Sequence, residues 1–171
     1  MIRHFISAAV VTTTLLLPAA LSAETRHLAR SGDWSASVTD VAFAMEANVF
    51  YLFEDTCTAK TGNEKVYLSV SVLPDDTTLV SIIAENWDWS ARQGDVKLVA
   101  GRTSVILQDA LYWDEFIFHG TYGASGGSAA MQVLAMSPEK IEVQDRRGRP
   151  IARFSSRGFE PTLDRVVRCA Q

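Results

Sequence analysis

The segment Gly123-Ala-Ser-Gly-Gly127 is the strongest candidate for catalytic chemistry in this chain, because it has the spacing G-x-S-x-G. In one class of hydrolases this spacing places a nucleophilic serine on a sharp turn between a strand and a helix. Such a serine needs an acid and then a histidine later in the chain, but no histidine follows Ser125. His119 precedes the motif and is the only histidine inside the predicted fold. We therefore interpret the segment as a glycine-rich loop before a helix and predict no catalytic residue.

Metal and cofactor chemistry would need groups of side chains that the sequence does not bring together. Zinc sites combine several cysteine or histidine ligands, and here both cysteines are expected to be bonded to each other. Asp75-Asp76 and Asp114-Glu115 are adjacent carboxylates, which on a strand would point to opposite faces. The chain has neither a Walker signature nor G-x-G-x-x-G. We predict no metal and no cofactor, although carboxylates distant in sequence remain free to converge in the fold.

The segment Asn86-Trp-Asp-Trp-Ser90 is the densest aromatic feature. In an extended conformation Trp87 and Trp89 share one face and Asp88 lies between them. If this face is exposed, it would stack on a sugar ring or on a partner's side chain. If it is buried, the two rings are part of the core, as tryptophan usually is. We take Trp87, Asp88 and Trp89 as the candidate binding surface. A second hypothesis is that the basic tip at Arg146–Arg149 contacts an acidic partner, the alternative being a solvated turn.

Cys57 and Cys169 are the only cysteines, so a disulfide has one possible connectivity. No C-x-x-C or Cys–His arrangement indicates a catalytic thiol. The alternative is two separate buried thiols. We predict the disulfide, because the chain also carries an export signal and disulfides persist in oxidising compartments.

Residues 1–23 have the layout of a cleavable secretory signal. Arg3 and His4 precede an apolar run, and Pro18-Ala-Ala-Leu-Ser-Ala23 ends in small residues, so that Leu21-Ser-Ala23 fits a signal-peptidase site. The alternative is a membrane anchor, but the run is short and rich in threonine. We predict cleavage near Glu24, a location in the periplasm or outside the cell, and no membrane span after the signal is removed.

Residues 24–171 are then predicted to form a single β-rich domain of ordinary size. Arg3 is the only Lys, Arg, Asp or Glu in the signal, so its removal changes the net charge from −4 to −5. This acidity argues against a nucleic-acid or anionic-membrane partner. The expected partner is an unknown protein or envelope component.

Alternating apolar residues dominate the mature chain and predict strands. The clearest lie at 34–39 and 66–72, and Leu79–Ala84 reads as a strand covered on both faces. Further strands are expected near 41–46, 48–54, 95–100, 103–108 and 112–119. Ile141 and Val143 pair with Ile151 and Phe154 in a hairpin whose turn contains Gly148.

Two segments depart from this alternation and predict helices. Residues 128–135 have high helix propensity and stop before Pro138. Phe159, Leu163, Val166 and Val167 share one helical face, which ends at Cys169. The sequence therefore predicts an antiparallel β-sandwich or flattened barrel of eight to ten strands, with one or two short helices. The C-terminal helix would be tethered by the disulfide.

The order of these features resembles a known group of proteins. A tryptophan near the mature start and Cys57 are followed by Glu85-Asn-Trp-Asp-Trp89 and Gly94-Asp-Val-Lys-Leu98, and the chain closes with a strand, Gly158, a helix and Cys169. This layout is similar to small secreted alphaproteobacterial proteins related to the invasion-associated locus B family. The resemblance implies a periplasmic antiparallel β-sandwich with a tethered C-terminal helix, and it supplies no active site. The segment 109–128 is longer here than in that pattern.

These observations favour an exported, non-catalytic binding or interaction module. A small hydrolase acting on envelope material is the alternative from a different class, and a structural or stress-related envelope accessory protein is a third. A concave pocket with two carboxylates, or with His119 and a carboxylate, would favour the enzyme. An apolar patch around Trp87 or Trp113 would favour binding, and fully buried tryptophans would favour the accessory protein.

Overall fold

Ten strands and two helices make up the computed structural model, which describes residues 25–45, 49–73, 77–84, 93–113, 116–122, 129–136 and 139–171. The strands are β1 (Arg26–Ser31), β2 (Trp34–Met45), β3 (Val49–Gly62), β4 (Val66–Val72), β5 (Thr77–Ala84), β6 (Gln93–Ala100), β7 (Thr103–Trp113), β8 (Phe116–Tyr122), β9 (Lys140–Gln144) and β10 (Pro150–Ser155). The helices are α1 (Ala129–Ala135) and α2 (Phe159–Ala170).

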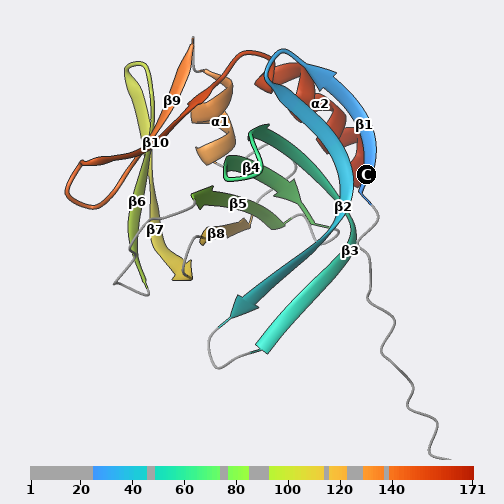
Figure 1. Ribbon diagram of the computed structural model, residues 1–171, viewed down its shortest axis with the longest axis horizontal. Coiled ribbons are helices and arrows are strands. Elements are labelled where there is room, and N and C mark those ends of the chain that lie inside the picture. Colours follow the sequence, from blue (N-terminus) through green and yellow to red (C-terminus); the bar gives the residue numbers. More distant parts are fainter. Residues whose placement is uncertain are drawn as a thin grey trace, which may run out of the picture.

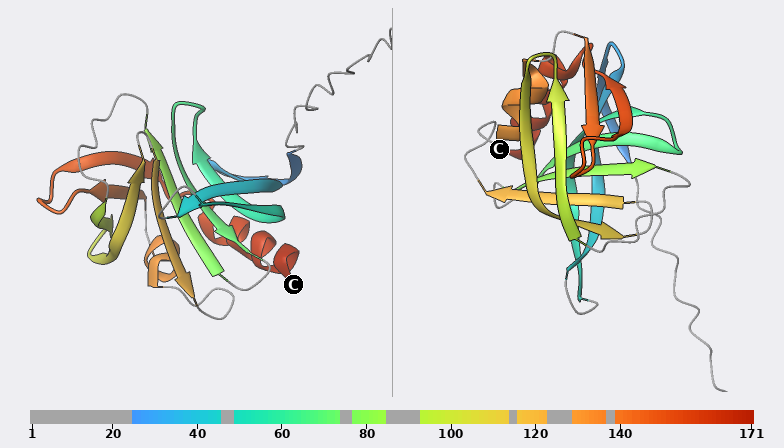
Figure 2. Two further views of the ribbon diagram at one scale, coloured as in Figure 1. Left: turned by 90° about the horizontal axis from the view of Figure 1, so that it is seen from below. Right: turned by 90° about the vertical axis from the view of Figure 1, so that its left-hand side faces the viewer.

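The strands follow one hydrogen-bonded order, β1-β2-β3-β4-β5-β8-β7-β6-β9-β10, and the pairs with a described register are antiparallel. β8 joins two layers, because it pairs with β5 along its whole length but with β7 only near Trp113. One layer holds β1–β5 and the other holds β6, β7, β9 and β10, with both helices between them (Figures 1 and 2). The predicted sandwich-like antiparallel fold is confirmed, and the described strands do not close into a barrel.

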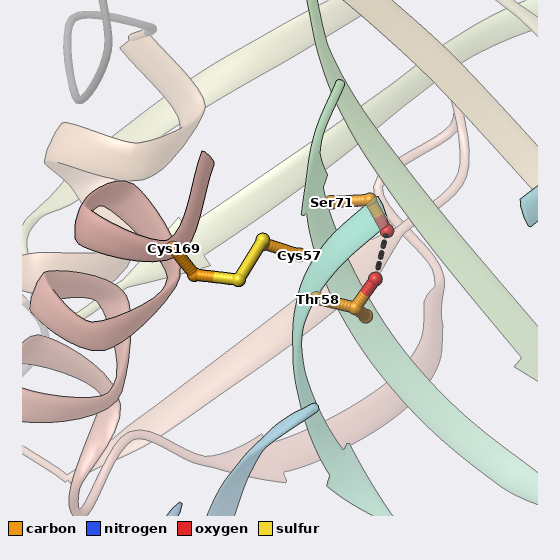
Figure 3. Close-up of a disulfide and its surroundings, with 4 residues drawn as sticks. All are labelled: Cys57, Thr58, Ser71 and Cys169. Carbon is orange, nitrogen blue, oxygen red and sulfur yellow. Dashed lines mark hydrogen bonds between the residues drawn. A yellow bond between two sulfur atoms is a disulfide. The ribbon is translucent and has the colours of Figure 1, made fainter. Parts of the chain in front are cut away.

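The predicted alternation holds on β2 but not on β4. Trp34, Ala36 and Val38 are buried while the residues between them are half-buried, as expected for one covered face. Every residue of β5 is buried, which confirms the strand covered on both faces. On β4 the expected solvent-facing Ser71 is only 2% exposed. Its hydroxyl pairs with the Thr58 hydroxyl of β3 at 2.9 Å, and this bond compensates the burial of both polar groups (Figure 3).

Both predicted helices are present at nearly the predicted bounds. α1 buries Ala130, Met131, Val133 and Leu134, and α2 buries Phe159, Thr162 and Val166. The Phe159 ring meets Trp34 of β2 edge-on, with 4.6 Å between the ring centres. The Trp34 Nε1 donates a hydrogen bond to the Ser155 carbonyl oxygen at 2.8 Å. One tryptophan thus connects the start of β2 to the end of β10 and to α2.

The disulfide between Cys57 and Cys169 is present and joins residues 112 positions apart in sequence. Figure 3 shows Cys57 on β3 and Cys169 at the end of α2. The C-terminal helix is therefore tethered to the sheet as predicted. Among the described residues, no helix is long and apolar enough to cross a membrane.

Three strand predictions were wrong in detail. β1 was not predicted, because its sequence is polar and its side chains are mostly exposed at the sheet edge; it also places His27 within the fold. The two strands expected at 34–39 and 41–46 are one strand, β2, with an irregularity between Thr39 and Val41. The single strand expected at 112–119 is the reversal between β7 and β8, since Trp113 pairs with Phe116.

Candidate functional site

Two glycine turns meet where the β1–β2 turn contacts the segment between β10 and α2. Gly32 lies between β1 and β2 with φ +55°, and Gly158 lies between β10 and α2 with φ +93°. The Asp33 N–H donates to the Arg157 carbonyl oxygen at 2.9 Å. A Cβ on Gly158 would overlap the Ser31 carbonyl, and a Cβ on Gly32 would overlap the Arg157 carbonyl. We call this contact the interlocked turns.

An ion pair closes the outside of the interlocked turns. The Arg157 Nη2 lies 3.0 Å from Asp33 Oδ1, and the Arg157 backbone N–H donates to the Ser155 hydroxyl at 3.2 Å. The Ser155 hydroxyl and then the Arg157 guanidinium hold the pKa of Asp33 below its ordinary value. Asp33 therefore stays ionised to a lower pH than a free aspartate.

Asp33 is expected to make the stability of the protein depend on acid pH. Its lowered pKa adds stability above the pKa of the unfolded chain, near 4, and this contribution is lost as pH falls through the folded value. Asp33→Asn should therefore destabilise the protein at neutral pH, and this effect should shrink as the pH falls below the pKa of the unfolded chain. Urea unfolding of the variant and the wild type over a series of pH values from neutral to acid measures this, and a difference that stays constant over the series would contradict it.

A pocket of about 600 Å³ lies beside the interlocked turns, at the start of α2. This volume is within the usual range for small-molecule sites. Its lining combines the end of β10, the first turn of α2 and single residues from three other places: Asp33, Ala135, Glu139, Ser155, Ser156, Arg157, Gly158, Phe159, Glu160 and Pro161. The interlocked turns and the packed ring of Phe159 fix these walls without a ligand.

Ser156 is the most deeply placed polar residue of this lining. It is 7% exposed, and its hydroxyl has no hydrogen-bond partner among the described residues. Its backbone is fully engaged: the N–H donates to the Glu139 carbonyl at 3.1 Å, and the carbonyl accepts from the Phe159 N–H at 3.0 Å. A buried hydroxyl with no partner costs about 1–3 kcal/mol, which a bound water, a functional role or local strain explains in other proteins.

The carboxylates of the pocket suit binding better than acid–base catalysis. Asp33 is kept ionised by its two partners, and the side chains of Glu139 and Glu160 are exposed. A general acid at neutral pH normally needs a buried carboxyl whose pKa is raised. Within the described ranges, no three histidine, cysteine or carboxylate side chains are grouped so as to hold a metal ion.

The residues singled out from the sequence do not form this pocket. Trp87, Asp88 and Trp89 lie outside the described residues, as does the Gly123–Gly127 motif, which falls between β8 and α1 as expected. His119 is on β8 opposite Val80, and its side chain is not described. The candidate binding surface therefore stays a prediction.

The basic tip is a turn between β9 and β10, as predicted, with Gly148 at φ +75°. Asp145 organises it, because its Oδ1 accepts the N–H groups of Arg147 and Arg149 at 2.8 and 2.9 Å. Its Oδ2 also accepts the Arg149 Nε at 2.7 Å. Arg146 and Arg147 are exposed, so the solvated-turn interpretation accounts for everything observed at this tip.

Sequence reasoning missed the pocket because its walls come from positions 33, 135, 139 and 155–161. The glycines are the one local signal at or next to these positions, since Gly32 follows β1 and Gly158 directly precedes α2. A search of protein-family models, of curated proteins and of solved structures finds no match to this chain.

Proposed function

We propose that this chain is an exported, non-catalytic binding module that holds a small ligand in the pocket between β10 and α2. The observation that carries the proposal is a pocket of about 600 Å³ whose lining includes both interlocked turns and the first turn of α2. Preorganised walls lower the cost of binding, because few side chains need to be ordered when the ligand arrives.

The proposed location is the periplasm or the outside of the cell. The Cys57–Cys169 disulfide supports an oxidising compartment, and residues 1–23 have the composition of a cleavable signal. The relation to the invasion-associated locus B family is a proposal of the same kind, supported by the tethered C-terminal helix that such a relation implies.

The hydrolase remains the second candidate, because the pocket does contain three carboxylate residues: Asp33, Glu139 and Glu160. We rank it lower since two of these carboxylates are exposed and the third is held ionised by Ser155 and Arg157. A hydrolase of envelope material would release product over time, whereas a binding module leaves its ligand unchanged. Mass analysis of the ligand after prolonged incubation separates the two functions.

Filling the pocket is expected to abolish ligand binding. Ala135 is an exposed residue at the end of α1 that lines the pocket, so Ala135→Phe places a ring in the cavity. Ala129→Phe is the matched control, because Ala129 is exposed at the other end of the same helix. The measurement is a small-molecule screen of the isotope-labelled exported protein by NMR, which identifies ligands that shift the amides of residues 155–160.

Ligands found in this way should bind Ala129→Phe like the wild type and should lose at least tenfold in affinity for Ala135→Phe. Circular dichroism and melting temperature should be similar for the two variants, since both substitutions are at exposed helix positions. Equal binding to both variants, or shifts confined to amides elsewhere, would refute the pocket as the site.

A further inference from the structure

The pocket beside the interlocked turns has more negative than positive charge. Its lining has one cationic residue, Arg157, and this guanidinium is 3.0 Å from Asp33. Glu139 and Glu160 have no ion-pair partner in the described part of the chain. The net charge of the lining is therefore −2 when all three carboxylates are ionised.

Helix stability accounts for the presence of one of these two glutamates but not of the other. Glu160 lies in the first turn of α2, where a negative side chain is favourable to the helix. Glu139 precedes β9 and belongs to no helix. Its backbone carbonyl binds the Ser156 N–H at 3.1 Å, which places Glu139 next to the residue with the unpartnered hydroxyl.

The polar groups left available in the pocket are mainly hydrogen-bond acceptors. These groups are the exposed carboxylates of Glu139 and Glu160, and carboxylate oxygens only accept when ionised. A ligand that satisfies them must therefore bring N–H donors and positive charge. Ala135 and Pro161 are exposed apolar residues of the lining and suit a short hydrocarbon chain.

We infer that the ligand of this pocket is an organic cation: an ammonium or guanidinium group on a short apolar chain, bound between Glu139 and Glu160. The inference rests on the proposed function and specifies its ligand class. A bare metal ion fits less well, because two exposed carboxylates fall short of the six or more oxygen ligands that calcium takes.

Three probes of equal chain length test the charge requirement: 1,5-diaminopentane, 1,5-pentanediol and glutarate. Each is titrated into the isotope-labelled exported protein with its disulfide intact, and the amides of residues 155–160 are followed by NMR. The diamine is expected to shift these amides, while the neutral diol and the dianion leave them in place at the same concentration.

Two variants and one control locate the charge. Glu139→Gln and Glu160→Gln should each weaken diamine binding about fivefold, which is the upper range for an ion pair at an exposed site. Glu64→Gln removes the same charge from an exposed position in the β3–β4 turn, outside the pocket, and should leave the affinity unchanged.

The outcomes separate this inference from the proposed function. Binding of the diol or of glutarate at these amides without the diamine would overturn the cation inference and leave the pocket as a binding site. If Glu64→Gln lost as much affinity as the pocket variants, the diamine would be held by general charge attraction, and the cation inference would be overturned. The absence of any shift with the diamine would overturn it as well. The proposed function itself would be overturned by ligands that bind Ala135→Phe and Ala129→Phe equally, or by ligands that shift only amides outside residues 155–160.

Discussion

Gly158→Ala is expected to lower the free energy of unfolding by about 3 kcal/mol or more. A non-glycine residue in the left-handed region costs about 1–2 kcal/mol, and Gly158 has φ +93°. The new Cβ would also overlap the Ser31 carbonyl and the Gly32 nitrogen, so the interlocked turns would have to separate. Displacing packed backbone adds about 1–3 kcal/mol. The melting temperature of a chain of this size should fall by roughly 6–12 °C.

Gly148→Ala is the matched control for this effect. Gly148 also has a positive φ, +75°, but a Cβ there would meet nothing within 4 Å. The Gly148→Ala variant should therefore lose only the conformational cost of a left-handed alanine, about 1–2 kcal/mol of unfolding free energy. Chemical unfolding of both variants measures the difference, and equal losses would mean that the interlocked turns tolerate a side chain.

Removing the disulfide is the second change with a large expected effect. The Cys57–Cys169 bridge spans 112 residues, and the chain-entropy model assigns a loop of about 100 residues nearly 5 kcal/mol. Native disulfides in small secreted domains typically contribute about 2–5 kcal/mol. Cys57→Ala with Cys169→Ala should therefore lose about this much stability. The C-terminal end of α2 should lose amide-exchange protection first, because the bridge attaches it to β3.

A reducing agent provides the internal control. It should destabilise the wild type by a similar amount and leave the double variant unchanged, since the variant has no thiols to release. If reduction leaves the unfolding midpoint of the wild type unchanged, the bridge contributes nothing and packing alone holds α2.

The elements that sequence predicted well are those whose pattern is local. α2 has an apolar face at helical spacing and a cysteine at its end, and in the structure the helix is buried on one face and bonded through that cysteine. β5 is apolar throughout and is buried throughout. β1 lacks such a pattern because an edge strand with exposed side chains needs no alternation. The reversal between β7 and β8 was missed because aromatic and apolar residues continue on both sides of it.

The candidate site could not be predicted from local sequence patterns, for a different reason. Each residue of the pocket is unremarkable in its own segment: Glu139 precedes a strand, Glu160 starts a helix, and Asp33 follows a turn glycine. Only strand order brings Asp33 and Arg157 together across 124 positions. Sequence instead directed attention to Trp87 and Trp89, where aromatic residues cluster.

The interlocked turns also govern when the pocket can exist. Asp33 and Trp34 belong to the hairpin formed by β1 and β2, yet their partners Arg157 and Ser155 are more than 120 positions later in the chain. Contacts of such separation carry a large loop-closure entropy and form slowly compared with local hairpins. The sheet can therefore pair strand by strand while the pocket is still absent. The pocket is complete only after β10 and α2 have folded, and a chain truncated before Arg157 would lack most of its lining.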